Sequence, residues 1–180
     1  MITPQGLFFA FLGGIFPAVF WLWFWLKEDS LHDEPRGLIL LTFLTGMLAG
    51  LLSLPFEKFA AGKNLSVQAT ILFWAITEEL FKFGAAYFVV LKKKVMNHAI
   101  DPMIYLITSA LGFAALENSF FLINPILSGN IVESILTGNL RFVGASVLHI
   151  ASSAIVGLCI ALSFYSKKWV QRISLFFGIN

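Results

Sequence analysis

The sequence predicts an all-α membrane protein, a polytopic bundle of about five transmembrane helices with short interfacial segments. Composition is the first observation: of 180 residues, 58% are hydrophobic and 12% are charged, and the mean hydropathy is +0.86. An average soluble domain carries about 25% charged residues. The second observation is that the charges lie mostly in short islands between long apolar runs, which keeps them out of lipid. We therefore expect residues 1–180 to form a single transmembrane domain.

Each expected span is an apolar run close to the roughly 20 residues that a helix needs to cross the hydrocarbon core. The first run lacks the basic start and the small-residue cleavage site of a secretory signal, so we expect it to remain as a span. Charged residues together with Pro, Gly and Asn separate the runs. The expected spans are residues 6–26, 37–54, 67–91, 103–123 and 142–165.

The segments between these spans are expected to be loops at the membrane surface. They comprise residues 27–36, 55–64, 92–101 and 124–139. The last of them is long and mildly apolar, which predicts a short amphipathic helix lying along the interface. The stretch that follows residue 165 is too short for a further span.

The basic residues predict the orientation of the chain. With five spans, one side of the membrane receives Lys27, Arg36, Lys92, Lys93, Lys94, Lys167, Lys168 and Arg172, and the other receives Lys58 and Lys63. The positive-inside rule places the basic side in the cytoplasm. We therefore expect an integral membrane protein with its N-terminus outside and its C-terminus in the cytoplasm.

Two classes of function are disfavoured. A net charge of +2 is too small to indicate a nucleic-acid partner. The single cysteine, Cys159, allows neither a disulfide framework nor a cysteine-based zinc motif within one chain, and we interpret it as a packing residue.

A small set of polar residues remains within or at the edge of the expected spans. These residues are Glu78, Glu79, Lys82, Glu117, Asn118, Arg141 and His149. A charge at the bilayer centre costs on the order of 3 kcal/mol, so we expect these side chains to face one another or a wet cavity. From a helix rise of about 1.5 Å per residue, Glu78, Glu117 and His149 all lie between the middle and the outer half of the membrane. The sequence therefore predicts one shared site.

The third span carries the densest part of this set. Glu78 and Lys82 are four residues apart and share a helix face, whereas Glu79 projects about 100° away from Glu78. Two adjacent carboxylates in a low dielectric do not both ionise cheaply, so we expect one to be protonated and Lys82 to hold the other charged. Such a division is what acid and base catalysis near neutral pH requires.

Several other interpretations of the same residues remain open. The cluster also fits a buried ion-pair network that fixes helix packing, a membrane scaffold or chaperone without catalytic activity, and a small transporter or proton relay. We interpret Ser152 and Ser153 as helix-packing residues and Arg141 as an anchor at the outer interface.

A zinc site is a further alternative. No H-E-x-x-H motif is present, and adjacent glutamates on one regular helix point apart. Glu117 and His149 with one glutamate of the third span would still supply three ligands and leave one coordination position open. Zinc therefore stays open as a cofactor, with Glu117 and His149 as its candidate ligands.

Four motifs resemble those of a known family. They are DEPR at 33–36 after the first span, EELFK at 78–82, DPMIYLITSALGFAALEN at 101–118, and RFVGASVLH at 141–149. In this order they resemble the PrsW family of membrane proteases, within the larger group that includes the CAAX prenyl endopeptidases.

The resemblance implies an intramembrane protease that cuts a membrane-anchored protein or peptide by glutamate-activated water, in the plasma membrane of a bacterium or an archaeon. The residues that match catalytic positions of the family are Glu78, Glu79, Glu117 and His149. We expect Glu78 or Glu79 to be the general base, with Lys82 holding its partner ionised.

For the remaining matched positions we expect supporting roles. Glu117 would orient His149, and His149 would stabilise the oxyanion or act as an acid. Asn118 either donates a hydrogen bond to the oxyanion or joins two helices, and both roles stay open.

Overall fold

The computed structural model describes residues 3–28, 34–93, 96 and 98–163. Lys94, Lys167, Lys168, Arg172, Asp33 and the last two residues of the predicted fifth span lie outside the described residues. All described elements are helical, which confirms the predicted all-α class. They are α1 (Pro4–Glu28), α2 (Arg36–Ala61), α3 (Val67–Ala86), the π-helical segment η1 (Tyr87–Leu91), α4 (Asp101–Leu127), α5 (Ile131–Leu140), the π-helical segment η2 (Arg141–Ala145) and α6 (Ser146–Ser163).

Among the described residues, four helical stretches have the length and composition to cross a membrane, which makes the chain an integral membrane protein. They are Pro4–Lys27, Arg36–Ala61, Asp101–Leu127 and Ile131–Leu162. The predicted third span also exists as one helical run, because η1 continues α3 to Leu91. Its three charged residues, Glu78, Glu79 and Lys82, keep it from resembling an ordinary apolar span.

The helices extend further than the apolar runs from which they were predicted. Pro55 lies inside α2, which continues to Ala61, so most of the expected loop 55–64 is helical. Within the expected interfacial segment 124–139 the predicted short helix is present as α5, but α4 reaches Leu127 and α5 continues through η2 into α6. The turn between α4 and α5 has only three residues, 128–130: Gly129 has a φ of 71°, and Asn130 caps α5 by accepting a hydrogen bond from the Glu133 N–H.

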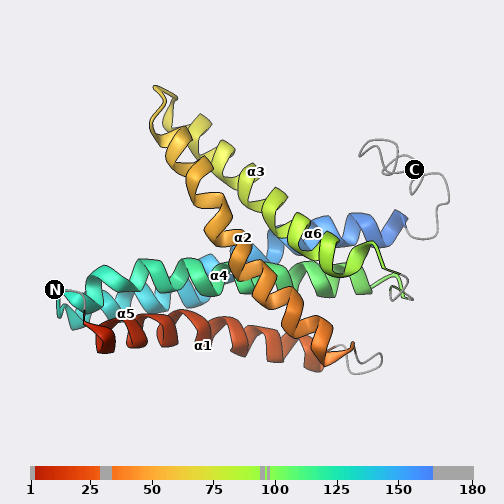
Figure 1. Cartoon of the computed structure of the whole chain (residues 1–180), viewed down its shortest axis with the longest axis horizontal. Coiled ribbons are helices and arrows are strands. Elements are labelled where there is room, and N and C mark those ends of the chain that lie inside the picture. The colour runs from red at the N-terminus through yellow and green to blue at the C-terminus, as the bar shows by residue number, and fades with distance from the viewer. Residues whose placement is uncertain (1–2, 29–33, 94–95, 97, 164–180) are drawn as a thin grey trace.

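Helix α4 forms the centre of the bundle, with α1, α2, α3, α5 and α6 packed around it. In Figure 1, α1 and α4 run along the long axis, and the hairpin of α2 and α3 crosses them at an angle. The crossing of α2 and α4 is close because each helix has a glycine there: a Cβ at Gly46 would clash with the Ser109 carbonyl, and one at Gly112 with the Phe43 carbonyl.

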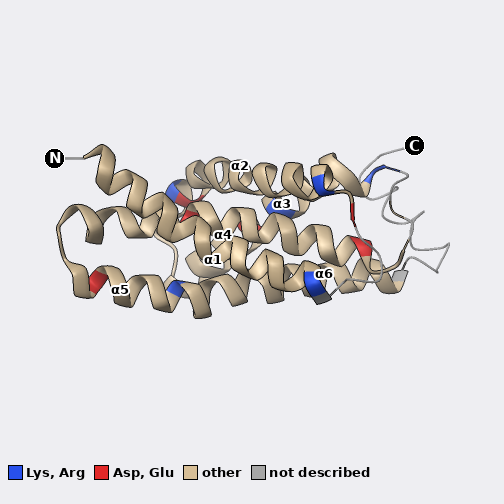
Figure 2. Cartoon of the chain, turned by 90° about the horizontal axis from the view of Figure 1, so that it is seen from below, with Lys and Arg blue, Asp and Glu red and all other residues tan. Residues whose placement is uncertain are grey.

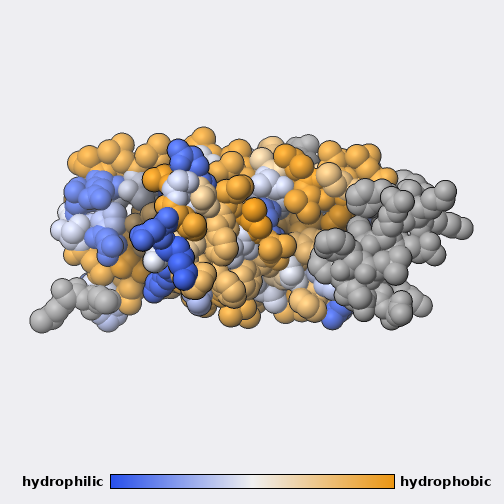
Figure 3. Space-filling view, turned by 90° about the horizontal axis from the view of Figure 1, so that it is seen from above, coloured by the Kyte–Doolittle hydropathy of each residue, from blue (hydrophilic) through white to orange (hydrophobic). Residues whose placement is uncertain are grey.

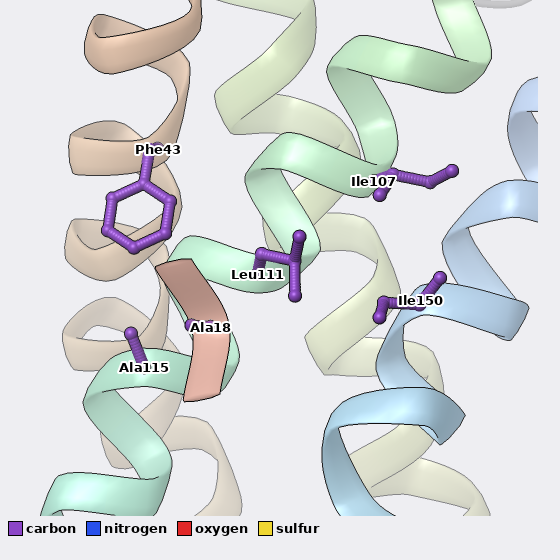
Figure 4. Packing of buried hydrophobic residues seen from close by; sticks show 6 residues of the cluster. All are labelled: Ala18, Phe43, Ile107, Leu111, Ala115 and Ile150. Atoms are coloured by element: carbon purple, nitrogen blue, oxygen red, sulfur yellow. The ribbon is translucent and has the colours of Figure 1, made fainter. Parts of the chain in front are cut away.

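The main hydrophobic core lies around the same helix. Figure 4 shows Ile107, Leu111 and Ala115 of α4 packed between Ala18 of α1, Phe43 of α2 and Ile150 of α6. The outside of the bundle is also apolar, with many exposed Leu, Ile, Val and Phe side chains, as Figure 3 shows for one face. This arrangement suits a bundle whose solvent is lipid.

Charged residues are sparse along the helices, and Figure 2 shows that most of the ribbon carries none. The start of α1 and the turn at 128–130 lie at one end of the molecule, the turn at 62–66 lies at the tip of the α2–α3 hairpin nearer to that end, and α1 and η1 end at the other (Figure 1). The charged residues inside the bundle therefore stand out as a separate group.

Candidate active site

Helices α3, α4 and α6 with the segment η2 bring the predicted polar residues together in one cluster. Lys82 lies at its centre and is only 1% exposed. Its Nζ atom is 2.7 Å from Glu79 Oε1, 2.8 Å from His149 Nδ1 and 3.6 Å from Glu78 Oε2. The ammonium also lies 4.7 Å from the centre of the Phe113 ring, which favours the cation. The sequence predicted the pair with Glu78, but the short contact is with Glu79.

The contacts of Lys82 determine the tautomer of His149. An ammonium group has three N–H donors and no acceptor, so His149 Nδ1 must accept the hydrogen bond from Lys82. The ring proton is then on Nε2, which donates to Glu117 Oε2 over 2.8 Å. His149 is therefore a neutral imidazole held between a cation and a carboxylate, which fixes the direction of its ring.

Arg141 belongs to the cluster, and its interpretation as an interfacial anchor is wrong. Its Nη2 atom donates to Glu117 Oε2 over 2.6 Å, and its Nε atom donates to Asn118 Oδ1 over 2.5 Å. Asn118 is buried and also donates to Ser146 Oγ over 3.2 Å, so both ends of its amide are engaged. The guanidinium therefore binds two neighbouring side chains of α4 at once.

The π-helical segment η2 explains how Arg141 reaches α4. A π-turn widens the helix by one residue and changes the direction of the side chains on either side of it. Its backbone is secured by Trp21 Nε1, which donates to the Phe142 carbonyl over 3.1 Å, and by Ser146 Oγ, which donates to the Arg141 carbonyl over 3.0 Å.

Glu79 is held by two serines in addition to Lys82. Ser152 Oγ donates to Glu79 Oε1 and Ser153 Oγ donates to Glu79 Oε2, each over 2.8 Å. The interpretation of these serines as packing residues therefore missed their contact with the cluster. Their spacing carried the signal, because residues three and four positions after His149 share its helix face.

Glu78 differs from Glu79 in its surroundings. Its side chain is 19% exposed, and its Oε2 atom lies 3.6 Å from Lys82 Nζ and 3.8 Å from His149 Nδ1. Among the described residues it makes no hydrogen bond. Within the glutamate pair, Glu79 thus accepts three hydrogen bonds on its two oxygens, and Glu78 retains free acceptor positions.

A fourth carboxylate, Glu57 of α2, lies close enough to act electrostatically on Glu78. It accepts a hydrogen bond from Ser53 Oγ over 2.6 Å, and its backbone carbonyl accepts one from Trp74 Nε1 over 3.0 Å. The sequence prediction placed it in a loop because Pro55 precedes it. The apolar residues Leu52, Phe56 and Phe59 continue the helical spacing past that proline and were the available signal.

The cluster carries more acidic than basic groups. Its carboxylates are Glu57, Glu78, Glu79 and Glu117, and its cations are Lys82 and Arg141. Because the carboxylates outnumber the cations, one carboxylate of the cluster can take up a proton, which a general base must do.

A helical bundle of membrane-spanning length that holds such an acid and base cluster inside is a polytopic membrane protein with a functional site in the bilayer, and it fits a membrane enzyme. A family model described as "PrsW family intramembrane metalloprotease" matches residues 34–179. The chain therefore belongs to the PrsW family of intramembrane proteases, and it is a hydrolase.

Individual relatives agree with this assignment. The chain is 29% identical to Protease PrsW of Halalkalibacterium halodurans, with 96% of this chain and 80% of the relative covered. It is 26% identical to Protease PrsW of Geobacillus kaustophilus, with 92% and 70% covered, and 30% identical to that of Oceanobacillus iheyensis, with 61% and 52% covered. No solved structure matches the chain.

The described residues do not fit a metal in their present arrangement. A zinc site needs three or four protein ligands that converge on one point. Within the described part of the chain, no group of three or more His, Cys, Asp and Glu side chains converges in this way. The candidates Glu117 and His149 contact each other directly, and the Lys82 ammonium lies among the remaining donors.

Proposed function

We propose that this chain hydrolyses a peptide bond of a membrane-anchored protein within the bilayer, with Glu78 as the general base. The observation that supports this assignment is the contrast within the glutamate pair. Glu79 accepts hydrogen bonds from Lys82, Ser152 and Ser153, whereas Glu78 accepts none from the described residues. A general base needs a free lone pair for the proton that it removes.

In the proposed reaction, Glu78 removes a proton from a water molecule while the water oxygen bonds to the peptide carbonyl carbon. The carbonyl oxygen becomes an oxyanion, and the protonated Glu78 then donates its proton to the leaving nitrogen as the carbon–nitrogen bond breaks. Lys82 uses two of its three donors on Glu79 and His149, so its third is free to stabilise the oxyanion.

The other residues of the cluster would position these groups. Glu79, clamped by Ser152 and Ser153, keeps Lys82 charged and in place. Glu117 holds the His149 ring, and His149 adds its dipole near the oxyanion. Asn118 is bonded on both sides to Arg141 and Ser146, which favours a helix-joining role over direct contact with the oxyanion.

The substrate would reach the cluster from the lipid, between α3 and α6. Apolar side chains flank the polar residues on both helices and are more than half exposed: Ile76 and Leu80 on α3, and Leu148 and Ile155 on α6. A membrane-spanning segment of another protein fits such a surface, because its apolar side chains can pack there without entering water.

We further propose that the N-terminus lies outside a bacterial plasma membrane and that the end of α6 faces the cytoplasm. Lys27, Arg36, Lys92 and Lys93 gather at one end of the bundle, and Lys58 and Lys63 lie at the other. The positive-inside rule places the first group in the cytoplasm.

Cleavage of membrane-tethered test proteins by the chain purified in detergent tests the assignment of Glu78. The variant Glu78→Gln should lose cleavage by roughly a hundredfold or more, the range expected for removing a general base. The matched control is Glu133→Gln, because Glu133 is an exposed glutamate of α5 outside the cluster. If Glu78→Gln is folded and cleaves as fast as the control, Glu78 is not the base.

A further inference from the structure

A cavity lies away from the active site, between the C-terminal half of α1 and the start of α2. Its volume is about 380 Å³, within the roughly 300–1,000 Å³ of small-molecule sites. The lining residues are Val19, Leu22, Leu26, Glu34, Arg36, Ile39, Leu40 and Phe43. None of them belongs to the catalytic cluster, and we call this region the α1–α2 groove.

The α1–α2 groove is polar at one end and apolar along its length. Arg36 is the first residue of α2, is exposed, and forms no ion pair with the described residues. Glu34 lies beside it and accepts a hydrogen bond from Tyr105 over 2.6 Å. Phe43 is seven residues further along α2, about 10 Å deeper by the helical rise. The two charges therefore lie at the level of the helix end, and the apolar walls extend from there into the span.

A smaller cavity of about 120 Å³ lies on another side of the same part of α1. Leu22 and Leu26 line both cavities. The smaller one is also lined by Trp25, whose buried indole N–H has no hydrogen-bond partner among the described residues. Loose packing thus continues around this half of α1, next to the α1–α2 groove.

The side chains that line the groove indicate which kind of molecule it binds. A helical segment, about 10 Å across, is too wide for a cavity of about 380 Å³. An extended peptide segment would leave its backbone N–H and C=O groups unpaired against six apolar side chains. A hydrocarbon chain has no such groups. At the mouth, the acid and the base side by side match a head group that carries a phosphate and an ammonium.

We propose that the α1–α2 groove binds one zwitterionic phospholipid of the ethanolamine type. Its phosphate meets Arg36, its ammonium lies toward Glu34, and one acyl chain follows Ile39, Leu40 and Phe43 into the span. The site secures the end of α1 against α2.

Lipid retention measured by native mass spectrometry tests this site. The full chain is purified in detergent and mixed with equal amounts of phosphatidylethanolamine and phosphatidylglycerol. We expect one retained phosphatidylethanolamine per chain. The variant Leu40→Trp, which fills the groove, should lower retention by on the order of tenfold. The variant Arg36→Gln should lose the preference between the two lipids.

The matched control is Leu44→Trp, one helical turn further along. Leu44 is 50% exposed, compared with 59% for Leu40, but it does not line the groove. Equal retention by the two tryptophan variants would mean that the bound lipid is ordinary boundary lipid, and the proposal would be wrong. Preferential retention of phosphatidylglycerol by the parent chain would overturn the assignment of the head group.

A photoreactive residue at position 40 gives a second measurement that does not depend on the folding of the tryptophan variants. In vesicles that contain phosphatidylethanolamine and a membrane-tethered test protein, it should crosslink to lipid. A crosslink to the protein would identify the groove as a peptide site and contradict the proposal.

Discussion

Replacing Lys82 with methionine tests whether the cluster is one electrostatic unit. Methionine keeps most of the volume of the side chain but removes the ammonium that contacts Glu79 at 2.7 Å and His149 at 2.8 Å. Removing one partner of a buried ion pair typically costs about 3–5 kcal/mol, because the other charge stays buried without compensation. We expect the free energy of unfolding to fall by about that amount, and cleavage to be lost.

A second substitution, at the Glu79 partner of Lys82, makes this prediction specific. If the penalty comes from the uncompensated carboxylate, then Lys82→Met combined with Glu79→Gln should be less destabilised than the sum of the single variants. We expect a coupling of about 1–3 kcal/mol, since the two residues are in direct contact.

Reversible unfolding by a denaturing detergent in mixed micelles, followed by circular dichroism, measures these free energies. Lys92→Met is the matched control, because Lys92 is exposed at the end of η1, and it should change stability by less than about 0.5 kcal/mol. Additivity of Lys82→Met and Glu79→Gln to within about 0.5 kcal/mol would refute the reasoning.

Three further variants probe the surroundings of the cluster. Ser153→Ala removes a hydrogen bond to the Glu79 carboxylate and should lower the free energy of unfolding by about 1.5–3 kcal/mol in the same assay; an unchanged value would contradict the clamp. Arg141→Lys keeps the positive charge but loses the guanidinium that binds Asn118 and Glu117 at once, so the rate of cleavage should fall by about tenfold or more. Full activity of this variant would show that the charge alone suffices. Gly112→Val should lower the free energy of unfolding by about 3 kcal/mol and so lower the thermal unfolding midpoint, whereas Gly144→Ala, with open space around it, should be tolerated; similar midpoints would contradict the close crossing.

Much of the fold could be predicted from the sequence because lipid imposes simple requirements on it. The third helical run, 67–91, has the predicted bounds, since its apolar residues end at charged and polar ones on both sides. The other helices were predicted too short. The expected spans stop at residues 54 and 123, before Pro55 and Pro125, but in a membrane helix neighbouring groups satisfy the backbone that a proline leaves free, so the helix continues.

The candidate site shows where the sequence stops being informative. The presence of Glu78, Glu79, Lys82, Glu117 and His149 at overlapping depths followed from their positions along the expected spans, because the rise of a helix is constant. Their meeting in one cluster is in agreement with that prediction, and their catalytic roles stay predictions.

Only the tertiary structure distinguishes the members of the cluster from one another. The angle at which α6 faces α3 decides that Ser152 and Ser153 clamp Glu79 and leave Glu78 free. The π-turn of η2 decides that Arg141 binds α4 rather than the membrane surface. The sequence determined that the charged residues must be buried next to one another, because lipid tolerates no isolated charge. The rotation and packing of the helices determined which of their atoms form pairs.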